Sequence, residues 1–140
     1  MDGTLSVSGL GGSDTVTVTD LTVTKATTIT LGSETDLLTI RNATFASTVS
    51  IDTGDGNDIV YLDRDDSNTG TSFTLPGTVT PTVTIKLGAG DDRIYIGADA
   101  ADRVLFSGRT VIDGGLGVDL YYCELNSKFL GTSQVLGFER

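Results

Sequence analysis

One aspartate recurs along this chain at a nearly regular interval, each time just before a short run of alternating apolar residues. It heads five segments, at Asp14, Asp36, Asp58, Asp92 and Asp119. The intervals are 22, 22, 34 and 27 residues, so the first two define a unit of 22 and the later two carry 12 and 5 extra residues. A period of this size is typical of stacked-repeat proteins, in which each unit forms one coil.

Apolar residues occupy the same positions relative to each of these aspartates. They stand seven residues before it, and two and four residues after it: Val7, Ile29, Ile51, Ile85 and Ile112; Val16, Leu38, Val60, Ile94 and Tyr121; Val18, Ile40, Leu62, Ile96 and Cys123. Alternation with a period of two indicates half-buried strands. A third short strand is expected at Leu21–Val23 and Ala43–Phe45, and at 104–106 in the fourth unit.

Identical alternation at a fixed interval stacks like residues on like residues. The sequence therefore predicts an all-β fold, a right-handed parallel β-solenoid of about five to six coils of roughly 22 residues. The abundance of Thr, Val and Gly agrees with strands joined by tight turns. The alternative is an antiparallel sandwich with hairpins at the glycine turns. A sandwich does not explain why every turn is followed by the same inward pattern.

We expect a single domain over residues 1–140. The extra residues should form an insertion loop at about 63–81 and a shorter one near 97–103. The tail, at about 124–140, departs from the repeat, and we expect Phe129, Leu136 and Phe138 to fold over the last coil as a cap.

Composition excludes several classes of protein. The formal net charge is −10, which disfavours nucleic-acid binding because phosphate is repelled. The chain has no histidine and one cysteine, so zinc sites, internal disulfides and histidine-assisted nucleophiles are not expected. No apolar run is long enough for membrane insertion, and the first residues do not resemble a signal peptide.

The glycine–aspartate turns resemble the nonapeptide repeats of the RTX, or hemolysin-type calcium-binding, family. The matching segments are GDGNDIVYL (54–62), GAGDDRIYI (88–96) and GLGVDLYYC (115–123). The resemblance implies Ca²⁺ bound between coils and a secreted or surface location in bacteria. Carried over by position, it implies Asp58, Asp92 and Asp119 as side-chain ligands. The assisting carbonyls would be those of Gly54, Gly56, Gly88, Gly90, Gly115 and Gly117.

The same turns have an explanation without metal. Glycine supplies positive φ at the bend, and aspartate accepts backbone N–H bonds inside the same bend. This chain has one acidic turn in 22 or more residues, so at most one edge of the coil is available for metal. Glu34 also stands where the second unit needs a glycine. Both interpretations stay open at the level of sequence.

Three tyrosines, Tyr61, Tyr95 and Tyr122, follow the turn aspartates at the same distance and should form an outward strip. Such a strip is suited to docking a neighbouring domain or a glycan. We predict a non-catalytic structural or adhesive repeat module whose partners are neighbouring coils or domains of a longer chain. The alternatives are a carbohydrate-binding module, a fragment of a polysaccharide-acting β-helix enzyme and, with less support, an ice-binding protein.

Overall fold

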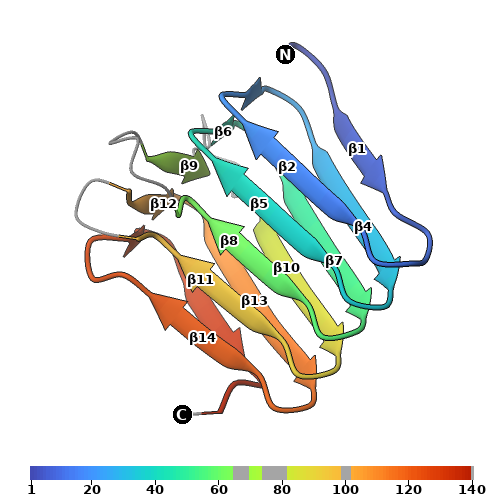
Figure 1. Ribbon diagram of the computed structural model, residues 1–140. Helices are drawn as coiled ribbons and strands as arrows, with labels where there is room; N and C mark the ends of the chain where they lie inside the picture. The colour runs from blue at the N-terminus through green and yellow to red at the C-terminus, as the bar shows by residue number, and fades with distance from the viewer. Residues whose placement is uncertain (65–69, 74–81, 99–101, 140) are drawn as a thin grey trace.

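The computed structural model describes residues 1–64, 70–73, 82–98 and 102–139, and its strands form three parallel sheets. Figure 1 shows the chain passing through the sheets in turn, with the two termini at opposite ends of the stack. The described residues contain no helix, and thus none that is long and apolar enough to cross a membrane. The chain is an all-β parallel β-solenoid of about five coils, so the predicted fold class is confirmed.

Sheet A forms one long side of every coil. Its six strands are, in spatial order, β1 (Leu5–Ser8), β4 (Thr27–Ser33), β7 (Val49–Asp55), β10 (Thr82–Ala89), β13 (Arg109–Leu116) and β16 (Ser133–Leu136). Inward positions alternate with outward ones along each strand. The residues seven before each aspartate stack in register and face the core, as predicted: Val7, Ile29, Ile51, Ile85 and Ile112.

Sheet B follows the acidic turn and lies in front of sheet A in Figure 1. Its strands are β2 (Thr15–Thr19), β5 (Leu37–Arg41), β8 (Ile59–Leu62), β11 (Arg93–Ile96) and β14 (Leu120–Cys123). The side chains two and four residues after each aspartate again stack in register. Those of the three middle coils are completely buried: Leu38, Ile40, Val60, Leu62, Ile94 and Ile96.

Sheet C is short and closes the third side of the coil. It contains β3 (Thr22–Val23), β6 (Thr44–Phe45), β9 (Thr71–Phe73), β12 (Val104–Phe106) and β15 (Lys128–Phe129). A stack of phenylalanines fills this corner. Ring centroids are 5.1 Å apart for Phe45 and Phe73, 4.8 Å for Phe73 and Phe106, and 4.6 Å for Phe106 and Phe129.

The prediction of a loop over 63–81 is wrong at residues 71–73, which form strand β9. The extra residues of the third unit lie on both sides of this strand, so the interval between aspartates conceals it. Phe73 nevertheless occupies the second position of the phenylalanine stack and is completely buried. Residues 65–69 and 74–81 of the predicted loop, and 99–101 of the shorter one, lie outside the described residues.

The tail also differs from the prediction. Instead of departing from the repeat, residues 124–139 continue it: β15 pairs with β12, and β16 pairs with β13. Phe129 extends the phenylalanine stack, and Val135 lies in register with Ile112. The apolar residues assigned to a cap therefore belong to a further partial coil, which the irregular turn residues of this segment conceal in the sequence.

The phenylalanine stack allows a test of the fold. We expect Phe73→Ala to lower the free energy of unfolding by about 3–5 kcal/mol, because it empties a completely buried position between two other rings. Urea unfolding followed by circular dichroism measures the loss. The matched control is Phe129→Ala at the end of the stack, where the ring is only half-buried, and its loss should be clearly smaller. Equal losses would contradict this account of the core.

Candidate functional site

The glycines of the acidic turns bring successive coils into direct backbone contact. Gly54, Gly88 and Gly115 stack on one another with φ of +100°, +108° and +100°. A β-carbon on Gly88 would collide with the carbonyl oxygen of Gly54, and one on Gly115 with that of Gly88. Gly56, Gly90 and Gly117 repeat the arrangement. Only glycine meets both requirements, so the turn pattern has a structural cause in this chain.

The turn aspartates form a continuous hydrogen-bonded column, which we call the aspartate ladder: Asp14, Asp36, Asp58, Asp92 and Asp119. In the last four, Oδ1 accepts the backbone N–H of the equivalent aspartate one coil earlier. The N–O distances along the ladder are 2.7, 2.8, 2.7 and 2.9 Å. The carboxylates therefore join neighbouring coils, whereas the sequence led us to expect hydrogen bonds inside one turn.

Glu139 ends this ladder. Its Oε2 accepts the backbone N–H of Asp119 at 2.7 Å, which is the contact that a sixth aspartate would make. Sequence reasoning missed this residue because it searched for aspartates. The available signal was the spacing, since Glu139 follows Asp119 by 20 residues, close to the basic period of 22.

The second carboxylate oxygen of the ladder aspartates, Oδ2, lacks the hydrogen bonds that Oδ1 makes. Oδ2 is buried in all five and has no hydrogen-bond partner among the described residues. Burial, the dominant effect, raises the pKa of Asp58 and Asp119 above the usual range and raises that of Asp92 to about 6. The backbone hydrogen bonds act in the opposite direction, and neighbouring carboxylates add to the increase.

The predicted calcium ligands come together only in part. The carbonyl oxygens of Gly54, Gly56, Gly88 and Gly90 lie against the glycine of the next coil, and each Oδ1 is bound to an amide. Within the described ranges, no group of three or more Asp, Glu, His or Cys is arranged to hold a metal ion. Ca²⁺ takes six to eight oxygen ligands. Neighbouring turns thus contact each other directly through their backbones. Among the carboxylate oxygens, Oδ2 is the one that remains available to a cation. Calcium binding stays a prediction.

A second bend of the coil uses another set of polar residues. Asp20, Asn42 and Asp63 have φ of +52°, +51° and +56°, in the left-handed region that Asn and Asp tolerate. The carboxylate of Asp63 is buried and accepts the N–H of Asn42 at 3.0 Å and that of Thr71 at 2.8 Å. Asp63 therefore fixes the start of β9, a structural role that sequence reasoning did not assign to it.

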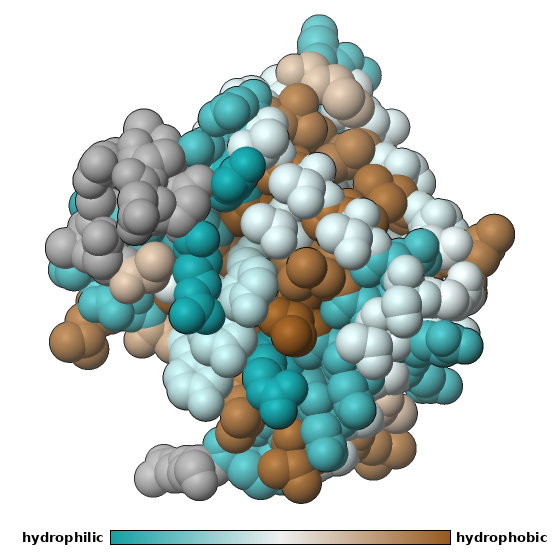
Figure 2. All heavy atoms as spheres, in the orientation of Figure 1, coloured by the Kyte–Doolittle hydropathy of each residue, from teal (hydrophilic) through white to brown (hydrophobic). Residues whose placement is uncertain are grey.

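The three tyrosines of the predicted strip do lie together on the outer face of sheet B. We call them the tyrosine stack. Ring centroids of Tyr61 and Tyr95 are 5.2 Å apart, and those of Tyr95 and Tyr122 are 4.7 Å apart with an angle of only 6° between the rings. The guanidinium of Arg64 lies 4.4 Å from the centre of Tyr95, a distance that permits a cation–π interaction. The surrounding face is mixed, with apolar patches among neutral and hydrophilic residues (Figure 2).

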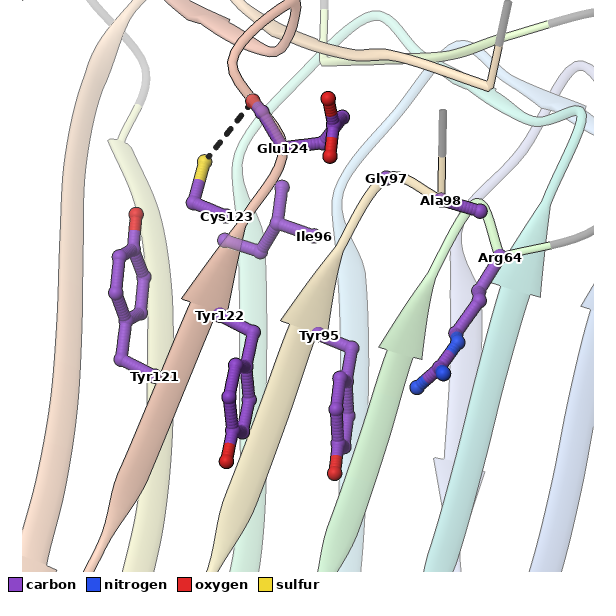
Figure 3. A pocket seen from close by; sticks show the side chains of 9 residues that line it. All are labelled: Arg64, Tyr95, Ile96, Gly97, Ala98, Tyr121, Tyr122, Cys123 and Glu124. Carbon is purple, nitrogen blue, oxygen red and sulfur yellow. Dashed lines mark hydrogen bonds between the residues drawn. The ribbon is translucent and has the colours of Figure 1, made fainter. Parts of the chain in front are cut away.

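An open groove of about 490 Å³ lies at the end of the tyrosine stack. Figure 3 shows the rings of Tyr95 and Tyr122 side by side, with Arg64 reaching toward Tyr95 and Glu124 on the next turn. The stacked rings cover each other's faces, and Tyr122, at the end, is 47% exposed. Tyr95 lies between the other two rings, so a glycan that stacks on flat ring faces would find an open face at the ends of the stack, where Tyr122 is the more exposed of the two. Binding by this strip stays a prediction.

Cys123 lies in the same groove, where its thiol donates to the carbonyl oxygen of Glu124 at 3.7 Å (Figure 3). Burial raises the pKa of this thiol. Since the thiolate is the reactive form of cysteine, this geometry does not favour a nucleophilic role.

Comparisons of the chain with family models, curated proteins and solved structures found no match. The likeness to RTX repeats therefore rests on the three turn segments alone and stays a prediction.

The buried carboxylates predict an unusual pH dependence. Because their pKa values are raised in the folded state, the folded chain binds protons more tightly than the unfolded chain does. Stability is then greatest at low pH and falls as the pH rises through about 6, the pKa of Asp92. In EGTA, we expect the melting temperature to increase as the pH is lowered from about 7.5 to about 5.

Asp92→Asn is the control for this prediction. Its amide oxygen still accepts the N–H of Asp58, but the buried charge is removed. The variant should be more stable than the parent chain at pH 7.5 and should depend less on pH. A parent chain whose melting temperature falls steadily over the same acid range would contradict the assignment of raised pKa values.

Proposed function

We propose that this chain is a non-catalytic structural module, a rigid spacer in a secreted or surface-exposed bacterial protein. The supporting observation is the unbroken stacking of equivalent side chains from the first coil to the last. Sheet A alone links six strands in register, and the aspartate ladder joins all five acidic turns. The bacterial and extracellular setting follows from the RTX resemblance.

Stacking of this kind resists bending because each coil is held on three sides. Sheets A, B and C each connect neighbouring coils through parallel strand pairing. Interior side chains are also fixed, since the central apolar positions of every sheet are completely buried. The carbohydrate-binding alternative has less support, because Tyr95 and Tyr122 stack on each other and these two ring faces are not accessible to a sugar.

A distance measurement tests the spacer directly. Ser6 and Gln134 occupy the same outward stack at opposite ends of sheet A. Spin labels on Ser6→Cys and Gln134→Cys, with Cys123→Ser as background, should give one narrow distribution by double electron–electron resonance. Five steps of about 4.8 Å place the two backbones about 24 Å apart. Labelled chains are diluted into unlabelled ones so that only distances within one chain are measured.

The urea-unfolded variant supplies the reference for a broad distribution. A distribution in native buffer that approaches this width would overturn the spacer proposal, because the coils would then move relative to one another.

Calcium is the cofactor that we propose for this module. The supporting observation is the row of buried Oδ2 atoms without partners, whose charge a cation would neutralise. Bound Ca²⁺ would add to stability in proportion to its occupancy and would not be needed for the contacts between turns.

We expect calcium to raise the stability of the folded chain. Extracellular sites commonly bind Ca²⁺ at 0.1–1 mM, so about 1 mM Ca²⁺ would contribute roughly 0.4–1.4 kcal/mol per site. Thermal melts in EGTA and in calcium measure the difference. Asp119→Asn should reduce it, whereas Asp20→Asn, at the second bend of the coil where the equivalent residue of the next coil is Asn42, should not. Identical melts of the parent chain under both conditions would refute the calcium proposal and leave the spacer proposal standing.

A further inference from the structure

Two rings of the tyrosine stack lie in an arrangement that suits covalent coupling. Tyr95 and Tyr122 are register partners on the neighbouring strands β11 and β14. Their ring centroids are 4.7 Å apart, and the angle between their planes is only 6°. This separation matches the distance between adjacent strands, so one ring is nearly a translated copy of the other. Each carbon ortho to a hydroxyl therefore lies about as close to its equivalent as the centroids do.

The pair is also open to a small reagent. Figure 3 shows the two rings side by side with both phenol oxygens at the same end. Tyr95 is half-buried and Tyr122 is 47% exposed, on the face of sheet B that points away from the apolar core. Any coil added before β2 or after β14 would extend the sheet and leave the contact between these two rings unchanged. Their chemistry thus requires no separation of the coils.

The other tyrosines are placed less favourably. Tyr61 and Tyr95 have centroids 5.2 Å apart, but their rings are inclined by 41°. The guanidinium of Arg64 lies 5.2 Å from the centre of Tyr61 and 4.4 Å from that of Tyr95, and it would have to move before these two rings could turn toward each other. Tyr121 packs against the core, where its ring contacts Phe138. Among the described residues, the geometry therefore selects one pair.

We propose that Tyr95 and Tyr122 are a site of oxidative coupling, where a peroxide-dependent oxidant forms a dityrosine cross-link between neighbouring coils. Each phenol loses one electron and its hydroxyl proton and becomes a phenoxyl radical, whose unpaired electron is shared with the ortho carbons. A Cε atom of one ring then bonds to a Cε atom of the other. The proton on each of these carbons moves to the phenol oxygen of the same ring, which restores both aromatic rings.

A peroxide balances this reaction. The linked product contains two hydrogen atoms fewer than the two tyrosines, so two electrons and two protons have left the protein. One molecule of hydrogen peroxide accepts them: its O–O bond breaks and two molecules of water form. Stacking favours the coupling because the two radicals are already held together, which makes the step unimolecular. The rings need only turn until their edges meet, and the exposed ring of Tyr122 has room to do so.

The cross-link would reinforce the contact between two coils. It would join residues that lie 27 positions apart along the chain. A covalent bond across such a loop stabilises the folded state by restricting the unfolded chain, as a disulfide does. The single cysteine cannot form an internal disulfide, so the tyrosine pair supplies a different covalent link. This modification goes beyond the spacer proposal and does not depend on it.

Photo-oxidation tests the site. Cys123→Ser serves as background, because the thiol is another oxidisable group. The chain, at low micromolar concentration, is illuminated briefly with ruthenium tris-bipyridine and persulfate, which is a peroxide. We expect a monomeric product that is lighter by two hydrogen atoms and has the blue fluorescence of dityrosine. Peptide mapping by mass spectrometry should place the link between Tyr95 and Tyr122, and the linked chain should unfold at a higher urea concentration than the unlinked one.

Conservative variants identify the partners. Tyr122→Phe keeps a stacked ring but removes the phenol, so it should abolish the linked monomer. The matched control is Tyr61→Phe, which leaves the proposed pair intact and should give nearly the same yield as the background chain. Circular dichroism verifies that both variants are folded. In urea the background chain should lose most of its linked monomer, because unfolding separates the two rings.

Three results would overturn the proposal. One is the absence of a linked monomer, including the case in which coupling occurs only between chains. Another is a link in the folded chain that maps to a different pair or persists in Tyr122→Phe. The third is an equal yield from folded and urea-unfolded chains, because the stacked geometry would then have no influence.

The outcome is separable from the spacer proposal. A chain that does not couple but keeps a narrow distance distribution between the labelled ends of sheet A would refute the cross-link and support rigidity.

Discussion

Each coil lies directly on its neighbour at the spacing of adjacent parallel strands, and the other features of the molecule depend on that contact. It pairs the backbones of three sheets and places the side chains of the strands on their equivalents in the next coil. At the acidic turn the backbones approach so closely that a β-carbon on Gly54 or Gly88 would collide with the coil before it. The turn sequence is thus constrained by the coil beneath it as much as by its own bend.

The same contact creates an electrostatic conflict. Stacking puts five carboxylates in one column. Four of them, those of Asp36, Asp58, Asp92 and Asp119, each bind one amide of the preceding coil, and the second oxygen of all five has no hydrogen-bond partner among the described residues. The hydrogen bonds fix the register of the coils, because a shift by one residue would leave every ladder amide without its acceptor. Loss of hydration is the opposing cost, and it is reflected in the raised pKa of Asp92.

Regular stacking also makes the end coils different from the interior ones. Each interior strand of sheet A pairs with a strand on both sides, whereas β1 and β16 each pair with one strand. The same parallel pairing joins successive coils in all three sheets, so one type of contact holds the described coils together.

The sequence by itself determined the fold class, the inward stacks in sheets A and B and the positions of the acidic turns, because these follow from a local period of two within a longer period. It did not show β9 or the coil formed by the tail, since extra or irregular residues disturb the interval there. Only the tertiary structure decided the role of the aspartates. Whether the Asp58 carboxylate faces an amide, a solvent-filled bend or a metal ion depends on which atoms of the preceding coil lie beside it. Asp36, 22 positions earlier along the chain, supplies the amide.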